Sequence, residues 1–307
     1  MIRFLIILIF FAVQPSFGQK WFDLANVYWR TSPSAKIEGS SEKRHFNTYI
    51  MDVKAPIVLD DKNLLLFGIE YQYNTITSNN PGIFPAYRFA SHMLQLGYEH
   101  KWNTSFKTLF MLMPRLNTDY SQVNFSHFQL GGLTLFSKER SEDFIFMFGA
   151  YYNGELFGPM IVPIVGFNWA ISEKWRWKML APLNLELAYM PKNWFRTGLR
   201  FDGFNASYRY QLIPGDPNSN RYIDKADNNA YLFTEFHLGK NCWINLRAGH
   251  SILRKYRFFQ LEEKMDLKVG PFNVHDDRNN DDPKAVPVLF KNSLSFEARF
   301  IYRLPLD

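Results

Sequence analysis

Histidine and serine side chains are the first residues in this chain whose spacing could support catalysis. Lipid hydrolases built on β-barrels place a His and a Ser two residues apart on one strand, where the imidazole can take the hydroxyl proton. The chain has seven His, and none has a Ser at i±2. His92, His127 and His250 each adjoin a Ser, but neighbouring residues of a strand point to opposite faces. A pair formed across two strands remains as an alternative hypothesis of a lipid hydrolase.

A second candidate set consists of charged residues expected to point to one face of successive strands. Inside a closed sheet, opposite charges would pair across strands and narrow the lumen. The alternative is a selectivity lining for a small polar or anionic solute. Both signs are present and no ring of a single sign is visible, so structural filling is the preferred interpretation. The set comprises Glu70, Glu99, Lys101, Arg115, Glu186, Arg196, Arg200, Arg209, Glu235, Arg247, Glu297 and Arg299.

A third candidate is the polar segment from Asp216 to Asp227. Its oxygen-bearing side chains occupy positions 1, 3, 5, 9 and 12, which is the spacing of an EF-hand calcium loop. Position 6 is Arg221 instead of the turn-forming Gly, and position 12 is Asp instead of Glu. A solvated loop rich in Asp and Asn gives the same pattern, so calcium binding stays a hypothesis. We assign no catalytic, cofactor-binding or metal-ligating residue and expect no cofactor.

The elements that would position these side chains are β-strands with a period of two. In 293–303, the apolar residues Leu294, Phe296, Ala298, Phe300 and Tyr302 alternate with Ser, Glu and Arg. A helix would mix these two sets within each turn, whereas a strand separates them. The same alternation runs through 93–102, 174–179, 184–189 and 195–202.

Strand length and turn length favour a membrane barrel over a soluble sandwich. Aromatic residues make up 18% of the chain, and several strands reach the roughly 9–11 residues of tilted membrane strands. Short links predicted at 103–104, 138–141, 172–173 and 240–241 alternate with long polar ones at 76–91, 212–228 and 257–290, as in outer-membrane barrels. We therefore predict an all-β fold, a transmembrane antiparallel up-and-down (meander) β-barrel of about 12–14 strands, with both ends in the periplasm.

The N-terminus predicts export. Residues 4–13 form an unbroken apolar run after Arg3, and this run is too short to cross a bilayer as a helix. Ser16 and Gly18 supply small residues before a cut at Gln19, so 1–18 is predicted to be a signal peptide. Residues 19–307 read as a single outer-membrane barrel domain. Cys242 is the only cysteine, so no internal disulfide is expected.

Four stretches carry a resemblance to a known family: 64–71 (LLLFGIEY), 95–102 (QLGYEHKW), 132–135 (GLTL) and, most closely, 149–191, which begins GAYYNGE. They resemble an uncharacterised family of outer-membrane β-barrels of Bacteroidota, a domain of unknown function. The resemblance implies a barrel in the cell outer membrane, and it implies neither an activity nor any functional residue.

Three functional hypotheses follow, and the first two are not enzymatic. The first is a narrow passive pore for small solutes, the second a binding or scaffold barrel that presents the loops 212–228 and 257–290, and the third a lipid hydrolase. The expected partners are outer-membrane lipid, the barrel-insertion machinery during biogenesis and a small polar solute. Nucleic acid is not expected, because the net charge of +6 is spread over alternate strand positions instead of one patch.

Overall fold

The computed structural model describes residues 21–305 except 38, 40, 79–85, 122, 204, 214, 277 and 279–286. The predicted signal peptide, 1–18, lies outside the described residues and stays a prediction. Nearly all of the described chain is β-strand, with two single-turn 3-10 helices, η1 (Phe125–His127) and η2 (Pro217–Ser219). In the part of the chain that the structure covers, no helix combines the length and the hydropathy needed to cross a membrane.

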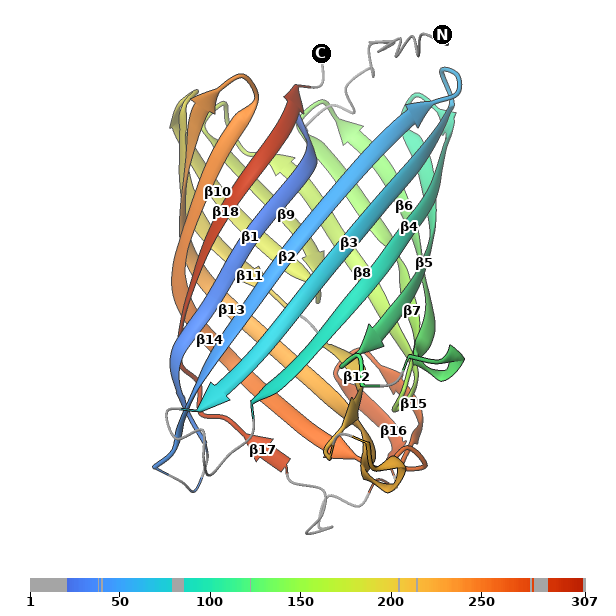
Figure 1. Ribbon diagram of the computed structural model, residues 1–307. Helices are drawn as coiled ribbons and strands as arrows, with labels where there is room; N and C mark the ends of the chain where they lie inside the picture. Colours follow the sequence, from blue (N-terminus) through green and yellow to red (C-terminus); the bar gives the residue numbers. More distant parts are fainter. Residues whose placement is uncertain are drawn as a thin grey trace, which may run out of the picture.

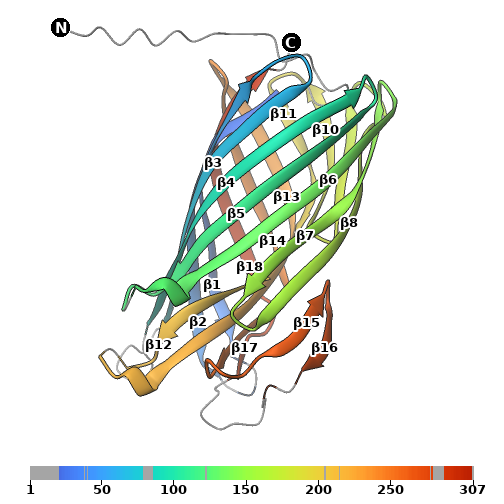
Figure 2. The ribbon, with the colours of Figure 1, turned by 90° about the vertical axis from the view of Figure 1, so that its right-hand side faces the viewer.

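Fourteen antiparallel strands form one closed barrel (Figure 1, Figure 2). Each strand pairs with the strand before it in the wall, and β18 closes the barrel by pairing with both β1 and β14. The predicted up-and-down barrel is thus confirmed, at the upper limit of the predicted strand count. The wall strands are β1 (Trp21–Lys36), β2 (Lys43–Val58), β3 (Asn63–Ser78), β4 (Tyr87–Asn103), β5 (Phe106–Thr118), β6 (Phe128–Ser141), β7 (Phe144–Glu155), β8 (Gly158–Ala170), β9 (Trp175–Ala181), β10 (Asn184–Lys192), β11 (Phe195–Asp202), β13 (Asn220–Gly239), β14 (Cys242–Phe259) and β18 (Leu294–Pro305).

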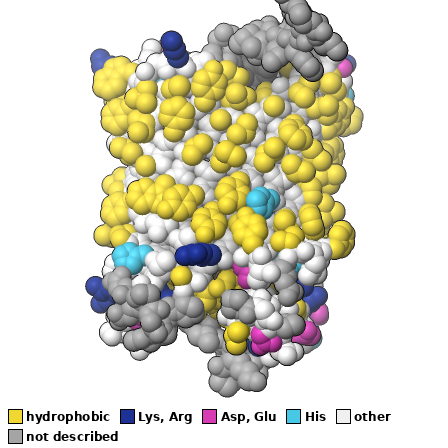
Figure 3. All heavy atoms as spheres, viewed as in Figure 1, with side chains coloured by type: hydrophobic (Ala, Val, Ile, Leu, Met, Phe, Trp, Pro, Cys, Tyr) yellow, Lys and Arg dark blue, Asp and Glu magenta, His cyan; other side chains and the backbone are white. Residues whose placement is uncertain are grey.

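The two faces of the wall have opposite polarity. On β4, Leu94 and Leu96 are 42% and 43% exposed, whereas Gln95 between them is 4% exposed. Hydrophobic side chains cover the outside of the wall, and charged side chains gather mainly at its two ends (Figure 3). A contiguous apolar belt of this size is compatible with lipid as the outer solvent and not with water. The predicted alternation therefore does position the lipid-facing and lumen-facing residues of a transmembrane barrel.

The two ends of the barrel differ in the length of their connections. Trp21 pairs with Pro305, so both ends of the described chain lie at one end, which we call the turn end (Figure 1). The wall strands are joined there by the short turns 59–62, 104–105, 142–143, 171–174, 193–194 and 240–241. We call the opposite end the loop end, because it carries every connection of six residues or more, together with the two-residue links 156–157 and 182–183.

Two sequence predictions about strand boundaries are wrong. The turn predicted at 138–141 is strand, because β6 continues to Ser141, which pairs with Phe144. The long loops predicted at 76–91, 212–228 and 257–290 begin or end as strand, since 76–78, 87–91, 220–228 and 257–259 belong to β3, β4, β13 and β14. Beyond the lipid, inward-pointing side chains of these strands, such as Ile76, Phe89 and Phe258, are apolar and buried in one cluster, so the apolar-outward, polar-inward alternation of the lipid-crossing part does not continue there.

Four further strands lie at the loop end and do not belong to the wall. They are β12 (Asn205–Gln211), β15 (Met265–Val269), β16 (Phe272–Asp276) and β17 (Pro287–Leu289). β12 pairs with the first part of β13, beyond the point where β11 ends. β15 and β16 form a hairpin, and β15 also pairs in parallel with β8 at Met160 and Ile161.

On one side of the barrel the wall strands are short and end before the loop end, and this makes room for β12. β9, β10 and β11 have only 7, 9 and 8 residues, whereas β13 has 20. Beyond the end of β11, the sheet therefore continues from β13 into β12, which contacts β4 and β5 on another side of the barrel. β12 thus crosses the mouth of the barrel at the loop end.

Apolar side chains fill this mouth. Tyr208 of β12 is fully buried and its ring lies 4.6 Å from the ring of Phe89 on β4, centroid to centroid. Tyr256 and Phe46 belong to the same cluster. A second cluster, which includes Phe157 and other side chains of β8, β13, β14 and β15, closes the side of the wall with the short strands. The apolar core of this barrel thus lies at the loop end, inside the mouth.

Candidate functional site: the lumen and its mouth

One side of the lumen is lined by a network of alternating charges. Arg247 on β14 binds Asp202 of β11 at 3.2 Å and Glu297 of β18 at 3.1 Å. Arg303 on β18 binds Glu235 of β13 at 2.6 Å. Four of the remaining pairs connect these strands to β1 and β10, and they are Arg30–Glu297, Arg303–Asp23, Arg196–Glu186 and Arg200–Glu186. The other three, Arg196–Glu235, Arg200–Asp202 and Arg299–Glu297, lie between β11 and β13 or within β11 and β18.

The geometry of this network favours structural filling over a selectivity ring. The carboxylate of Glu297 contacts three guanidinium groups, those of Arg30, Arg247 and Arg299. A carboxylate shared in this way offsets the positive charges of the guanidinium groups around it. Paired hydrogen bonds between guanidinium and carboxylate groups also fix the position of the long Arg side chains. The pairing of inward charges that the sequence predicted is therefore observed on this side of the lumen.

The opposite side of the lumen is lined mainly by uncharged polar groups. Gln72, Asn74, Gln95 and Asn168 on β3, β4 and β8 are all buried and point inward. Gln72 donates to Asn74, whose Oδ1 also accepts from Thr48. Hence one side of the lumen carries an extended ion-pair network, and on the opposite side amide and hydroxyl groups lie among isolated ion pairs such as Asp52–Lys54. Both sides offer hydrogen-bonding groups to water or to a polar solute.

The predicted inward charges do not all belong to this lining. Glu70, Glu99 and Arg115 lie on wall strands of the uncharged side, where Glu99 binds Lys107 at 2.9 Å. Arg209 was predicted to line the lumen and does not lie in the wall, since it belongs to β12. Its neighbours Tyr208 and Tyr210 give β12 the alternation of a wall strand, which explains the error.

The sequence also missed several members of the network. Arg303 could have been found, because it continues the period of two from Arg299. Asp23 and Arg30 lie in a stretch with weak alternation, and a bulge shifts the register of β1 after Asp23. Glu155 is the last residue of β7, and only the structure shows what it binds.

Glu155 and its neighbours hold β12 inside the mouth through Ser207. The backbone N–H and the hydroxyl of Ser207 both donate to Glu155 Oε2, at 2.7 and 2.6 Å. The carbonyl of Ser207 accepts from Asn117 Nδ2 at 2.8 Å and from Gln129 Nε2 at 3.0 Å. The N–H of Leu156 donates to the Ser207 hydroxyl at 2.7 Å. We call these contacts the Ser207 clasp.

The Ser207 clasp replaces a strand neighbour. One edge of β12 is paired with β13, where Ser207 lies opposite Asp224. At Ser207, the other edge is satisfied by side chains of three wall strands, β5, β6 and β7. Unpaired edge groups cost free energy when they are buried, so the wall provides donors and acceptors for a strand that it does not incorporate.

The calcium hypothesis for Asp216–Asp227 fails on this geometry. The segment is not a loop over its second half, because β13 begins at Asn220. Asp224 binds Arg257 at 2.8 Å and Arg278 at 3.0 Å, and Asp227 binds Arg254 at 3.1 Å. The carboxylates expected as ligands therefore bind guanidinium groups. Among the described residues, no group of three or more His, Cys, Asp or Glu side chains is arranged to hold a metal ion.

The histidines that were candidates for a hydrolase have other partners. His92 Nε2 lies 2.7 Å from the hydroxyl of Tyr120, and His250 Nδ1 lies 2.9 Å from the backbone oxygen of Ser251. His127 Nδ1 lies 2.9 Å from Oγ1 of Thr118, a fully buried residue. These contacts place no serine hydroxyl next to the imidazoles of His92, His127 or His250.

Comparison with known families identifies the group of proteins to which this barrel is related. Residues 60–269 match the model of a family described as Domain of unknown function (DUF6268). The chain belongs to this family. The matched residues include the Ser207 clasp, β12 and most of the wall of this DUF6268 barrel. The origin in Bacteroidota that the resemblance implied stays a prediction. A comparison of the DUF6268 chain with curated proteins finds no match.

Three solved structures are similar to this DUF6268 protein, and one of them is described as an outer membrane channel. The COG4313 outer membrane channel from Pseudomonas putida F1 is 10% identical, with 95% of this chain and 100% of that chain covered and a TM-score of 0.48. A Pseudomonas aeruginosa FadL homologue is 10% identical, with 92% and 90% covered and a TM-score of 0.43. The translocator domain of the autotransporter NalP from Neisseria meningitidis is 9% identical, with 92% and 88% covered and a TM-score of 0.37. At this level of likeness no activity is carried over.

Proposed function

We propose that this protein is an outer-membrane channel for small polar solutes, closed at its loop end by β12 in the conformation described. The turn end would face the periplasm and the loop end the outside of the cell, as the connection lengths favour. The protein would act without catalysis. The observation that carries this proposal is the Ser207 clasp, because it holds inside the lumen a strand that the wall does not need for its own closure.

The size of the barrel supports this proposal. Barrels of about 8 strands are filled by their own side chains, whereas those of 16–18 strands leave an aqueous channel. A barrel of 14 strands lies between these cases. At the loop end, the space that remains is occupied by β12 and the apolar cluster around Tyr208. Displacement of β12 would expose polar groups such as Asn117 and Gln129, which water and small polar solutes can replace as partners.

Planar-bilayer conductance tests the proposal with a matched variant. In this variant, residues 205–211 are replaced by an equal number of Gly and Ser residues, so the wall and the loop length are retained. We expect rare or small openings for the natural protein and a larger, sustained conductance for the variant. The fold of both proteins is checked by heat-modifiable migration on gels. A folded variant that conducts no more than the natural protein would show that β12 does not close a pore.

A binding barrel is a second candidate function, and one observation favours it. A polar pocket lies beside β12 at the loop end, and residues from the two loop regions named in the sequence-based scaffold hypothesis contribute to it. If the Gly and Ser variant does not conduct, this second function becomes the better account of the fold.

A further inference from the structure

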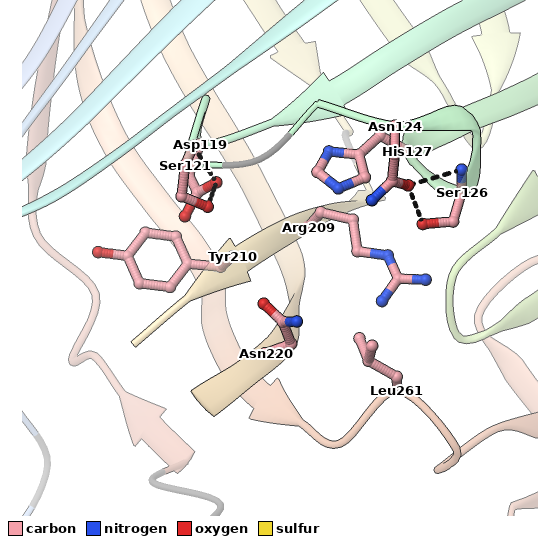
Figure 4. Close-up of a pocket in the computed structure, with 9 residues that line it drawn as sticks. All are labelled: Asp119, Ser121, Asn124, Ser126, His127, Arg209, Tyr210, Asn220 and Leu261. Carbon is pink, nitrogen blue, oxygen red and sulfur yellow. Dashed lines mark hydrogen bonds between the residues drawn. The ribbon is translucent and has the colours of Figure 1, made fainter. Parts of the chain in front are cut away.

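A pocket of about 150 Å³ lies where β12 meets the wall (Figure 4). We call it the seam pocket. Its lining comes from the β5–β6 connection, from β12, from the start of β13 and from the residue Leu261 after β14. The residues that matter for ligand chemistry are Asp119, Asn124, His127, Arg209 and Asn220. They are far apart in the sequence and meet only because β12 crosses the mouth.

Arg209 is the cation of the seam pocket. Other arginines at the loop end bind carboxylates of the chain, as Arg254 binds Asp227 and Arg278 binds Asp276. Arg209 takes part in none of the ion pairs found among the described residues, and its Nε is buried without a hydrogen-bond partner. Burial lowers the pKa of Arg209, and the nearby carboxylate of Glu262 acts in the opposite direction. A guanidinium remains charged at neutral pH, and its planar fork matches a carboxylate or a phosphate.

The only carboxylate among the lining residues does not compete for Arg209. Asp119 Oδ1 accepts from the N–H and the hydroxyl of Ser121, at 3.0 and 2.7 Å. Its Oδ2 accepts from the backbone N–H of Gln211 on β12 at 2.7 Å. Both oxygens are thus occupied in holding the loop and β12 together, so Arg209 has no carboxylate partner in the lining of the pocket.

Neutral donors surround the same space. Asn124 Oδ1 accepts from the N–H and the hydroxyl of Ser126 (Figure 4), which orients the amide and leaves its Nδ2 as the donor. The Nδ1 of His127 is engaged with Thr118, so Nε2 is the ring atom left for a ligand. Asn220 contributes a second amide. One cation and several neutral donors form a site for an anionic oxygen group.

We propose that the seam pocket binds a small molecule through a carboxylate or phosphate group, with Arg209 as the principal contact. The volume admits a group of a few heavy atoms and excludes a polymer from its interior. The proposal is independent of whether the barrel conducts, because the pocket is complete in the closed conformation. Two ligand sources share this chemistry: phosphate groups and the carboxylates of small organic acids.

Isothermal titration calorimetry on the detergent-solubilised full barrel tests the site, with inorganic phosphate and glucuronate as separate probes. The ionic strength is held constant with sodium chloride, and uncharged glucose serves as the blank. We expect saturable binding of at least one probe, and the probe that binds distinguishes the two sources. Absence of saturable heat with both probes would overturn the proposal.

Three variants make the result specific to the pocket. Arg209→Gln is expected to weaken binding at least tenfold. Arg221→Gln is the matched control, because Arg221 also lies at the loop end but donates to backbone carbonyls, and binding should be unchanged. Since Arg209→Gln could also loosen β12, Asn124→Asp is the second test, because it adds a negative charge to the pocket without altering β12. Equal affinity in the natural protein and in Asn124→Asp would also rule out the site.

Discussion

Replacing Glu155 by Gln should release β12 from the mouth while leaving the wall intact. Gln keeps the size and one oxygen acceptor of Glu, so Ser207 can still donate hydrogen bonds to it. The clasp loses the charge at Oε2, which now accepts both the N–H and the hydroxyl of Ser207, at 2.7 and 2.6 Å. The change also replaces Oε1, which accepts from Asn153 Nδ2 and lies 3.9 Å from Arg115 Nη1, by an amide donor. The perturbation thus weakens the Ser207 clasp without creating a cavity.

The expected size of the effect follows from these two bonds. A hydrogen bond to a charged group contributes about 1.5–3 kcal/mol and a neutral one about 0.5–1.5 kcal/mol. The change should therefore cost about 1 kcal/mol per bond, or about 2 kcal/mol for the clasp. Because about 1.4 kcal/mol corresponds to a factor of ten, the ratio of displaced to seated β12 should rise roughly 30-fold.

Single-channel recording measures this ratio as the frequency of opening. Glu99→Gln is the matched control, because Glu99 is an inward carboxylate that binds Lys107 on the wall and has no contact with β12. We expect Glu155→Gln to open more often than the natural protein with unchanged amplitude. Glu99→Gln should open as often as the natural protein. An identical opening frequency in the natural protein and in a folded Glu155→Gln variant would refute the argument that the clasp holds the mouth closed.

Three further predictions concern the lipid face and the seam pocket. Leu96→Lys places a charge on the lipid-facing side of β4 and should lower the free energy of unfolding in urea by about 2–4 kcal/mol. Phe272→Lys on β16, outside the wall, should change this free energy by less than about 0.5 kcal/mol. Equal effects of the two substitutions would contradict the assignment of the lipid face. The pKa of His127 is lowered by burial and by Arg209, and Asp119 opposes this effect. As the pH falls, His127 is therefore protonated in the unfolded chain before it is protonated in the folded protein. The free energy of unfolding should thus decrease as pH falls below about 6.5. A carboxylate bound beside His127 favours the imidazolium, so glucuronate should bind more tightly at pH 5.5 than at pH 7.5, and calorimetry on His127→Gln should show this dependence removed.

The wall of the barrel was predictable from sequence because lipid imposes one rule on every strand that crosses it. Leu94 and Leu96 must face hydrocarbon and Gln95 must not, so the residue types along each strand show which side chains point outward. Inward charges on strands with clear alternation, such as Glu186 and Arg247, were predictable for the same reason, whereas Asp23 and Arg30 on β1 were not. The individual ion pairs were not predictable. Glu297 on β18, for example, pairs with Arg30 on β1 as well as with Arg247 on β14, and β1 and β18 become neighbours only when the barrel closes.

The mouth could not be predicted, since no such rule operates beyond the lipid. β12 alternates like a wall strand, yet its edge is bound by Asn117, Gln129 and Glu155 instead of a neighbouring strand. The seam pocket joins residues from four separate segments, and none of them forms a motif. The EF-hand spacing at 216–227 misled for a related reason, because a spacing of oxygen side chains does not fix the backbone shape that a metal site needs.

The pairing of β18 has a consequence for how the molecule is made. β18 pairs with both β1 and β14, so the facing edges of β1 and β14 stay unpaired until the last strand has been synthesised. Until then, β1 has a bare edge and every lipid-facing side chain already made has no lipid around it. Contacts between such distant segments form slowly, because a long loop must be closed first. A chain that lacks β18 would therefore present an unpaired strand edge, which is a template for pairing with other chains, until the cylinder is completed.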